Sequence, residues 1–144
     1  MAIRGRVRFK ATDIFDAPED SLRYEVSQLG IDVALLQPSA YPTPMYAKVQ
    51  QPEDAARAAS YGAVGEIPGA MFKHFSSMFQ AADAPNPHDV AEAIAKLIAL
   101  PKGARPLRTV VGAAFGSDSV NEQTAPVQAH VVEALGLGHL AKVA

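Results

Sequence analysis

Residues 30–45 combine a run of apolar residues with a loop of hydroxyl-bearing side chains, whose backbone and hydroxyl groups could bind a ligand. The run Ile31–Leu36 is apolar at five of its six positions, and only Asp32 interrupts it. Such a run is typical of a parallel strand covered on both faces. The loop that follows contains Pro38, Ser39, Tyr41 and Thr43. A plain proline-rich loop leaving a strand has the same composition, so both interpretations stay open.

This loop resembles the last cofactor-contacting segment of the short-chain dehydrogenase/reductases (SDRs). In that family a hydrophobic strand ends in the motif P-G-x-x-x-T. Pro38 and Thr43 fall on its outer positions, and Ser39 replaces the glycine. The resemblance implies that the backbone around Pro38 and Ser39, with Tyr41 and the Thr43 hydroxyl, contacts the nicotinamide carboxamide of NAD or NADP. It also implies that the Ser39 side chain stands where the nicotinamide ring approaches closely.

Aromatic residues follow at helical spacing. Phe72, Phe75 and Phe79 recur on one face of a predicted helix. By the same resemblance they correspond, with Met45 and Tyr46, to a lid over an apolar substrate. A stripe at this spacing is also typical of plain core packing, which remains the alternative.

The dinucleotide phosphate loop of the family does not occur in this sequence. That loop is a G-x-G-x-x-G turn between a strand and a helix, where backbone N–H groups hold the pyrophosphate. The only partial match is formed by Gly136, Gly138 and Ala141, close to the C-terminus and after a predicted helix. We interpret it as a helix C-cap. Binding of NAD or NADP by this chain alone is therefore not expected.

The acid/base pair of the family, Tyr-x-x-x-Lys, is also missing. No lysine stands four residues after any of the 4 tyrosines, which are Tyr24, Tyr41, Tyr46 and Tyr61. Aligning residues 21–26 with the end of the family's catalytic helix places the pair at Arg8 and Thr12. Arginine stays protonated, and threonine carries no charge to tune a neighbour. We therefore assign no catalytic residue to this chain.

The amino-acid composition limits the classes of protein to which this chain can belong. Hydrophobic residues make up 49% and charged residues 19%, the balance of one globular domain. A net charge of -2 offers no overall attraction to nucleic acid or anionic lipid, although the alternating basic residues of the segment 3–10 leave a weak nucleic-acid hypothesis. The absence of cysteine excludes disulfides, and His74, His88, His130 and His139 lack metal-ligand spacing. No apolar run reaches membrane-spanning length, so a cytoplasmic location is the default.

Capping residues and periodicity predict the elements that would position these side chains. Gly30, Gly62, Pro101 and Gly136 each end a predicted helix. The predicted helices cover residues 18–29, 53–61, 68–81, 86–100 and 121–135. The predicted strands cover about 31–37 and 107–113.

This order predicts an α/β fold, a partial Rossmann type in which two core parallel strands are joined by a helical crossover and flanked by helices. It matches the C-terminal half of the SDR fold over roughly residues 15–136. We therefore divide the chain into a basic leader, residues 1–14, that does not match the family, and an SDR-like part, residues 15–144. The expected buried centre comprises Ile31, Val33, Leu35, Val110 and Val111, with Val90, Ile94 and Leu97 packed over it.

Two functional hypotheses follow. The preferred one is an SDR-like NAD(P)-dependent oxidoreductase fragment from a truncated or altered reading frame, inactive alone. The alternative is a non-catalytic oligomerisation or interaction module derived from an SDR. In either case the strand ending at Pro38 would have lost a neighbour of the parent sheet. We expect that edge to be covered by residues 3–10, by a second copy in a homo-oligomer, or by a related SDR subunit.

We expect no detectable dehydrogenase activity with either nicotinamide cofactor. Acid/base catalysis alone contributes about 10²- to 10⁴-fold, and loss of cofactor positioning removes more. Assays with NADPH and a panel of ketones check this expectation. Turnover that survives rigorous purification and the Thr43→Ala substitution would contradict the fragment hypothesis.

Overall fold

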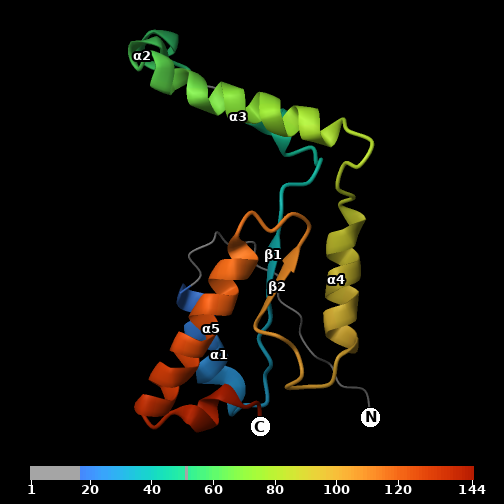
Figure 1. Ribbon diagram of the computed structural model, residues 1–144, viewed down its shortest axis with the longest axis vertical. Coiled ribbons are helices and arrows are strands. Elements are labelled where there is room, and N and C mark those ends of the chain that lie inside the picture. Colours follow the sequence, from blue (N-terminus) through green and yellow to red (C-terminus); the bar gives the residue numbers. More distant parts are fainter. Residues whose placement is uncertain (1–16, 51) are drawn as a thin grey trace. The chain divides into compact units, whose positions relative to one another are not determined.

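The computed structural model describes residues 17–50 and 52–144, with the side chains of residues 17–19 excluded. The basic leader, residues 1–14, lies outside the described residues. In the described part the chain is mostly helical and contains one sheet of two parallel strands (Figure 1). The elements in chain order are α1 (Ala17–Ser27), β1 (Leu35–Pro38), η1 (Tyr46–Lys48), α2 (Ala55–Ser60), α3 (Ala63–Phe79), α4 (His88–Ala99), β2 (Arg108–Val111), α5 (Ser117–Ala134) and η2 (Gly138–Ala141).

The predicted parallel pair joined by a helical crossover is confirmed. The Leu35 N–H donates to the Leu107 carbonyl at 2.6 Å, and the Ser39 N–H donates to the Val111 carbonyl at 2.8 Å. In a parallel pair of strands, the backbone N–H and C=O groups of alternate residues point to the same edge. The backbone groups of Leu35, Gln37 and Ser39 therefore face β2. Leu36 and Pro38 therefore face the opposite edge, where the missing N–H of proline breaks no ladder hydrogen bond.

Each predicted helix exists, with shifted boundaries. Helix α3 begins at Ala63 and not at residue 68, because Gly62, with a φ of 54°, makes the turn out of α2 and Pro68 is tolerated inside the helix. Helix α5 begins at Ser117, after Gly116 with a φ of 90°, four residues earlier than predicted. Helix α1 ends at Ser27 as the chain turns through Gly30, whose φ is 70°.

Strand β1 is shorter than predicted at its start, since residues 31–34 are not part of the sheet. Asp32 explains the difference. Its side chain is only 6% exposed, and it accepts hydrogen bonds from the Gly103 N–H at 2.9 Å and from Arg105 Nη1 at 3.0 Å. This segment is thus held to the turn before β2 by a carboxylate and not by strand pairing.

The buried centre was predicted only in part. Leu35 and Val111 are buried, 5% and 9% exposed, as expected. Ile31 was assigned wrongly, because it is 50% exposed and belongs to the segment that Asp32 holds outside the sheet. The other predicted core residues are only half-buried, namely Val33, Val90, Ile94, Leu97 and Val110.

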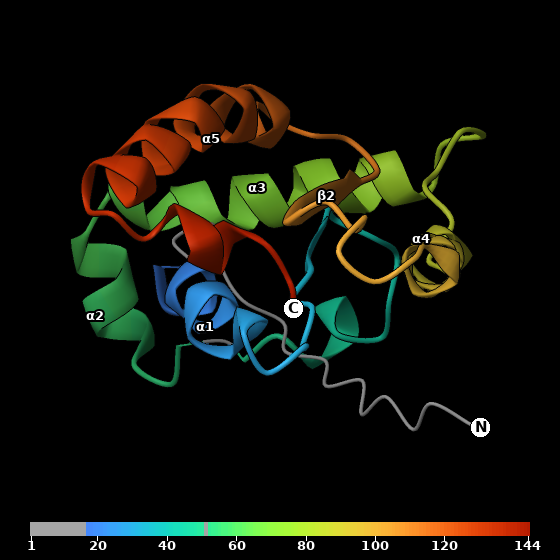
Figure 2. The same ribbon diagram turned by 90° about the horizontal axis from the view of Figure 1, so that it is seen from below.

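The chain divides into two compact units. Unit 1 contains α1, most of β1, the beginning of β2, α5 and η2. Within it, Asp20 on α1 forms an ion pair with Arg108 on β2, and Gln128 on α5 donates to the same Asp20 oxygen at 2.6 Å. The Ala144 N–H donates to the Ser27 carbonyl at 3.0 Å, which brings η2 and the chain end against α1 (Figure 2).

Unit 2 comprises residues 38–99 and 110–114, and it contains η1, α2, α3, α4 and the carboxyl ends of both strands. Helices α2 and α3 meet closely at Gly65, where an added Cβ would lie 2.8 Å from the Ala58 carbonyl oxygen. None of the described helices is both long enough and apolar enough to cross a membrane.

Leu35→Ala is expected to lower the free energy of unfolding by about 2–5 kcal/mol, because the side chain is buried at the strand pair. Ile31→Ala is the matched control. Its side chain is half exposed, so the loss should stay below about 1 kcal/mol. Urea unfolding of both variants gives the comparison, and an unchanged midpoint for Leu35→Ala would mean that the strand assignment is wrong.

Candidate functional site

The carboxyl ends of β1 and β2 bring the predicted ligand loop against a glycine that follows the second strand. Gly112 has a φ of 86°, a left-handed conformation that favours glycine. A Cβ added there would lie 2.7 Å from Tyr41 Oη and 3.0 Å from Ser39 Cβ. The loop after β1 therefore lies directly on the backbone after β2. In open sheets with parallel strands, ligands bind outside the carboxyl ends of the strands.

Tyr41 is the most buried side chain of this loop. It is 6% exposed, and its hydroxyl is buried without a hydrogen-bond partner among the described residues. Burial raises the pKa of Tyr41 above 10.0, and the nearby Asp89 carboxylate raises it further. At neutral pH the side chain is thus a neutral phenol that can donate a hydrogen bond and cannot act as a base.

The other predicted cofactor-contacting residues occupy the same loop at different depths. Pro38 is the exposed last residue of β1, and Ser39 is half-buried against Gly112. Thr43 is exposed, and its carbonyl accepts the N–H of Tyr46 at 3.3 Å, which begins the turn into η1. The fold therefore brings Ser39 and Tyr41 together at the strand ends and leaves Thr43 at the surface.

The predicted lid residues form an aromatic cluster around Tyr46. The ring centroid of Tyr46 lies 6.5 Å from Phe72, 6.3 Å from Phe75 and 4.8 Å from Phe79, the last in an edge-to-face arrangement. Phe75 and Phe79 stack on each other at 6.4 Å. Phe72 is 42% exposed, so the cluster is a partly open apolar surface and not a sealed core. Met45 is 64% exposed.

The glycine-rich run near the C-terminus is a helix C-cap, as predicted. Gly136 has a φ of 72°, its N–H donates to the Glu133 carbonyl at 2.9 Å, and the Leu137 N–H donates to the Val132 carbonyl at 3.0 Å. These bonds close the end of α5. Gly138 also faces α5, because an added Cβ there would collide with the Glu133 carboxylate.

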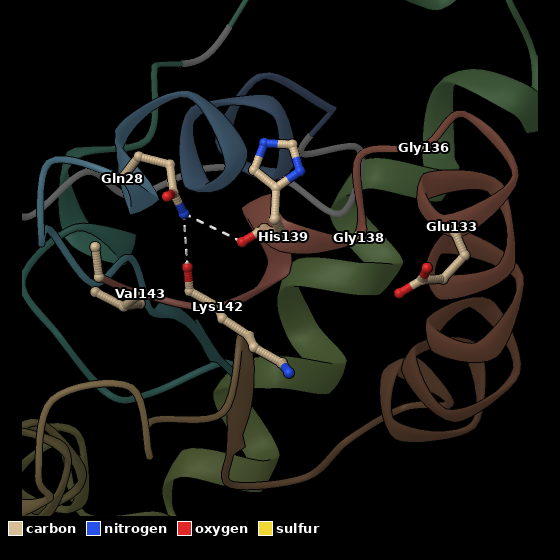
Figure 3. Close-up of a pocket in the computed structure, with 8 residues that line it drawn as sticks. Gln28, Glu133, Gly136, Gly138, His139, Lys142 and Val143 are labelled. Carbon is tan, nitrogen blue, oxygen red and sulfur yellow. Dashed lines mark hydrogen bonds between the residues drawn. The ribbon is translucent and has the colours of Figure 1, made fainter.

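A surface hollow of about 550 Å³ lies beside this cap (Figure 3). Gln28 crosses it and donates from Nε2 to the carbonyls of His139 and Lys142, each at 3.1 Å. None of the residues that line the hollow is buried. Gln28 therefore fixes the terminal turn to α1, and the hollow presents no enclosed polar group to a ligand.

Histidines do not build a metal centre in the part of the chain that the structure describes, where no three His, Asp or Glu side chains converge. His74 meets the edge of Phe75 with ring centroids 6.2 Å apart. His88, His130 and His139 are exposed.

Sequence reasoning missed two features of the structure, of which only the first belongs to this loop. The first is Gly112, which could have been noticed as an isolated glycine at the end of an apolar strand, a frequent sign of close backbone approach. The second is the half-buried polar cluster of Asp20, Arg108 and Gln128 in unit 1, in which Arg108 Nη1 also donates to Gln128 Oε1 at 3.2 Å. No local sequence pattern predicts this cluster, because its members come from three elements that are distant in the sequence.

No protein-family model and no curated protein sequence matches this chain. The comparisons therefore place this chain in no known family.

Tyr41→Phe is expected to leave the protein at least as stable at pH 7, and up to about 1–3 kcal/mol more stable, because it removes a buried hydroxyl that has no described partner. The raised pKa has a further consequence. The unfolded chain ionises near pH 10.0 while folded Tyr41 stays neutral, so wild-type stability is full below that pH and falls as the pH rises through the folded pKa.

The phenylalanine variant should lose less stability in that alkaline range. Tyr61→Phe is the matched control. Because Tyr61 is 58% exposed, this substitution should change neither the stability at pH 7 nor its loss at alkaline pH. Thermal unfolding between pH 7 and pH 11 gives both measurements. A loss of more than about 1 kcal/mol for Tyr41→Phe at pH 7 would show that the hydroxyl is hydrogen-bonded.

Proposed function

We propose that this chain is the C-terminal, substrate-side part of an SDR-like NAD(P)-dependent oxidoreductase of Rossmann type. Alone it is inactive, because it contains neither the phosphate-binding turn nor the Tyr-x-x-x-Lys pair. What it would contribute is the rim on which the nicotinamide and the substrate meet.

One observation carries the proposal. The loop that bears the P-S-x-x-x-T variant of the family motif leaves the carboxyl end of a parallel strand and packs on Gly112 at the carboxyl end of the next. That is the position where α/β sheets bind nucleotides.

In this proposal the exposed residues and the buried residue of the loop have different roles. The exposed Thr43 hydroxyl and the backbone around Pro38 and Ser39 would hold the nicotinamide carboxamide. The buried Tyr41 would set the height of the loop above Gly112. The partly open cluster of Tyr46, with Phe72, Phe75 and Phe79, would cover an apolar substrate.

A second candidate is a non-catalytic interaction module. It is favoured by the apolar side chains that α3 and α5 expose, for example Val64 at 66%, Ile67 at 53% and Val127 at 62%. Rows of exposed apolar residues are typical of protein interaction surfaces.

Titration of the ¹⁵N-labelled chain with nicotinamide mononucleotide, followed by NMR, separates the two candidates. The proposed function predicts weak, saturable shifts at the amides of residues 39–43 and Gly112. Thr43→Ala should raise the dissociation constant for nicotinamide mononucleotide by about 3- to 10-fold, because it removes one hydrogen bond. Thr124→Ala is the control, because the Thr124 hydroxyl donates to the Val120 carbonyl inside α5 at 2.8 Å.

Adenosine monophosphate provides the ligand control, since the adenine half of the family's site would lie outside this sequence. A folded chain whose loop amides do not respond to nicotinamide mononucleotide would favour the interaction module. The DNA upstream of the codon for Met1 gives an independent check. Finding a G-x-G-x-x-G turn and a Tyr-x-x-x-Lys pair in another frame would support the oxidoreductase origin.

A further inference from the structure

Gly112 leaves open the space that the Tyr41 hydroxyl occupies. A Cβ built on Gly112 would lie 2.7 Å from Tyr41 Oη, 3.0 Å from Ser39 Cβ and 3.2 Å from Tyr41 Cζ. The first of these distances is shorter than a Cβ and an oxygen atom tolerate, so an alanine at position 112 would have to displace the tyrosine. All three residues belong to unit 2, and the contact therefore lies within one compact unit.

The loop is the part of the structure that would yield to such a side chain. Tyr41 is 6% exposed, so rotating its ring into solvent would expose the apolar surface that it now buries. Its hydroxyl has no hydrogen-bond partner among the described residues, so a small shift of the ring breaks no hydrogen bond. A shift of the loop backbone that keeps the ring covered is therefore the less costly response.

Few backbone hydrogen bonds oppose a shift of the loop. The Ser39 N–H donates to the Val111 carbonyl at 2.8 Å, and the Thr43 carbonyl accepts the Tyr46 N–H at 3.3 Å. Between these two bonds, no backbone hydrogen bond of the described residues involves residues 40–42. The middle of the loop is thus held by side-chain packing, and the tyrosine is its one buried side chain.

Two prolines would carry a displacement along the loop. Pro42 follows Tyr41 directly, and Pro44 follows Thr43. A proline ring fixes the φ angle of its own residue, and it restricts the residue before it to extended conformations. Residues 41–44 therefore form a stiff segment, in which a displacement of Tyr41 also moves Thr43.

We propose that Gly112 is a positioning residue for Thr43. It acts through the Tyr41 hydroxyl and the stiff segment 41–44, and so sets how far this segment stands from the strand ends. The inference rests on the proposed function only where Thr43 is taken as a ligand contact. The positioning itself is a property of the folded chain and can be tested without a ligand.

Gly112→Ala and Gly116→Ala form a matched pair of variants. Both place alanine in a left-handed conformation, because the φ angles are 86° and 90°. A Cβ at Gly116 meets nothing within 4 Å, so only the first variant meets the tyrosine. Gly112→Ala should lower the ratio of folded to unfolded protein at least about 5-fold more than Gly116→Ala does. It alone should move the Thr43 amide signal in the ¹⁵N spectrum.

Tyr41→Phe supplies the rescue, because it removes the oxygen atom that lies 2.7 Å from the added Cβ. In the Tyr41→Phe background, the loss caused by Gly112→Ala should shrink at least about 3-fold, and the loss caused by Gly116→Ala should not change. Rescue should be partial, since the contacts at 3.0 Å and 3.2 Å remain.

Equal losses for the two alanine variants would overturn the proposal, as would an unmoved Thr43 signal or a lack of rescue. Should Gly112→Ala fail to fold, the double variant with Tyr41→Phe must fold, and its failure would also overturn the proposal.

Titration with nicotinamide mononucleotide connects the positioning to the proposed function. If the loop binds this ligand, Gly112→Ala should raise the dissociation constant by about as much as Thr43→Ala, about 3- to 10-fold, and Tyr41→Phe should restore part of the affinity. A wild type that does not bind the ligand would contradict the proposed function alone, because the stability and amide comparisons decide the positioning independently.

Discussion

The parallel pairing of β1 with β2 is the interaction on which the rest of the structure depends. Parallel neighbours cannot be joined by a tight turn, so the chain must leave the sheet after Pro38 and return at Arg108. The whole segment between the two strands, which includes the aromatic cluster, forms the crossover connection. The same pairing brings the beginning of the crossover, Ser39 and Tyr41, to the glycine that follows β2. Its apolar support is small, since the buried hydrophobic residues of the described chain are Leu35, Tyr41 and Val111.

Polar contacts between distant segments supplement that small core. Asp20, Arg108 and Gln128 connect two helices to β2, and Asp32 holds the turn before β2 to the segment before β1. Partly buried ion pairs of this kind contribute little net free energy relative to apolar packing, but removing one partner leaves a partly buried charge unpaired. They therefore fix which segments meet more than they stabilise the fold.

Local signals were sufficient to predict the helices and the parallel order. Gly30, Gly62 and Gly136 end helices where the sequence indicated, because a left-handed residue is a local requirement that glycine meets. The assignment of Ile31 to the core was wrong, because the apolar run hides the effect of Asp32, whose partners lie some seventy positions along the chain. Periodicity carries no information about such partners. The same limit applies to the site, where the loop was predicted and its contact with Gly112 was not.

The alternation of β1 has a consequence for how the protein behaves when concentrated. On the edge away from β2, Leu36 is the only residue of β1 that can offer an N–H to an incoming strand, because Pro38 has none and the other residues face β2. A foreign strand could add there through too few hydrogen bonds to hold a register. Pro38 thus disfavours the addition of a foreign strand to this edge of β1, so the residue that ends the strand also limits aggregation through it.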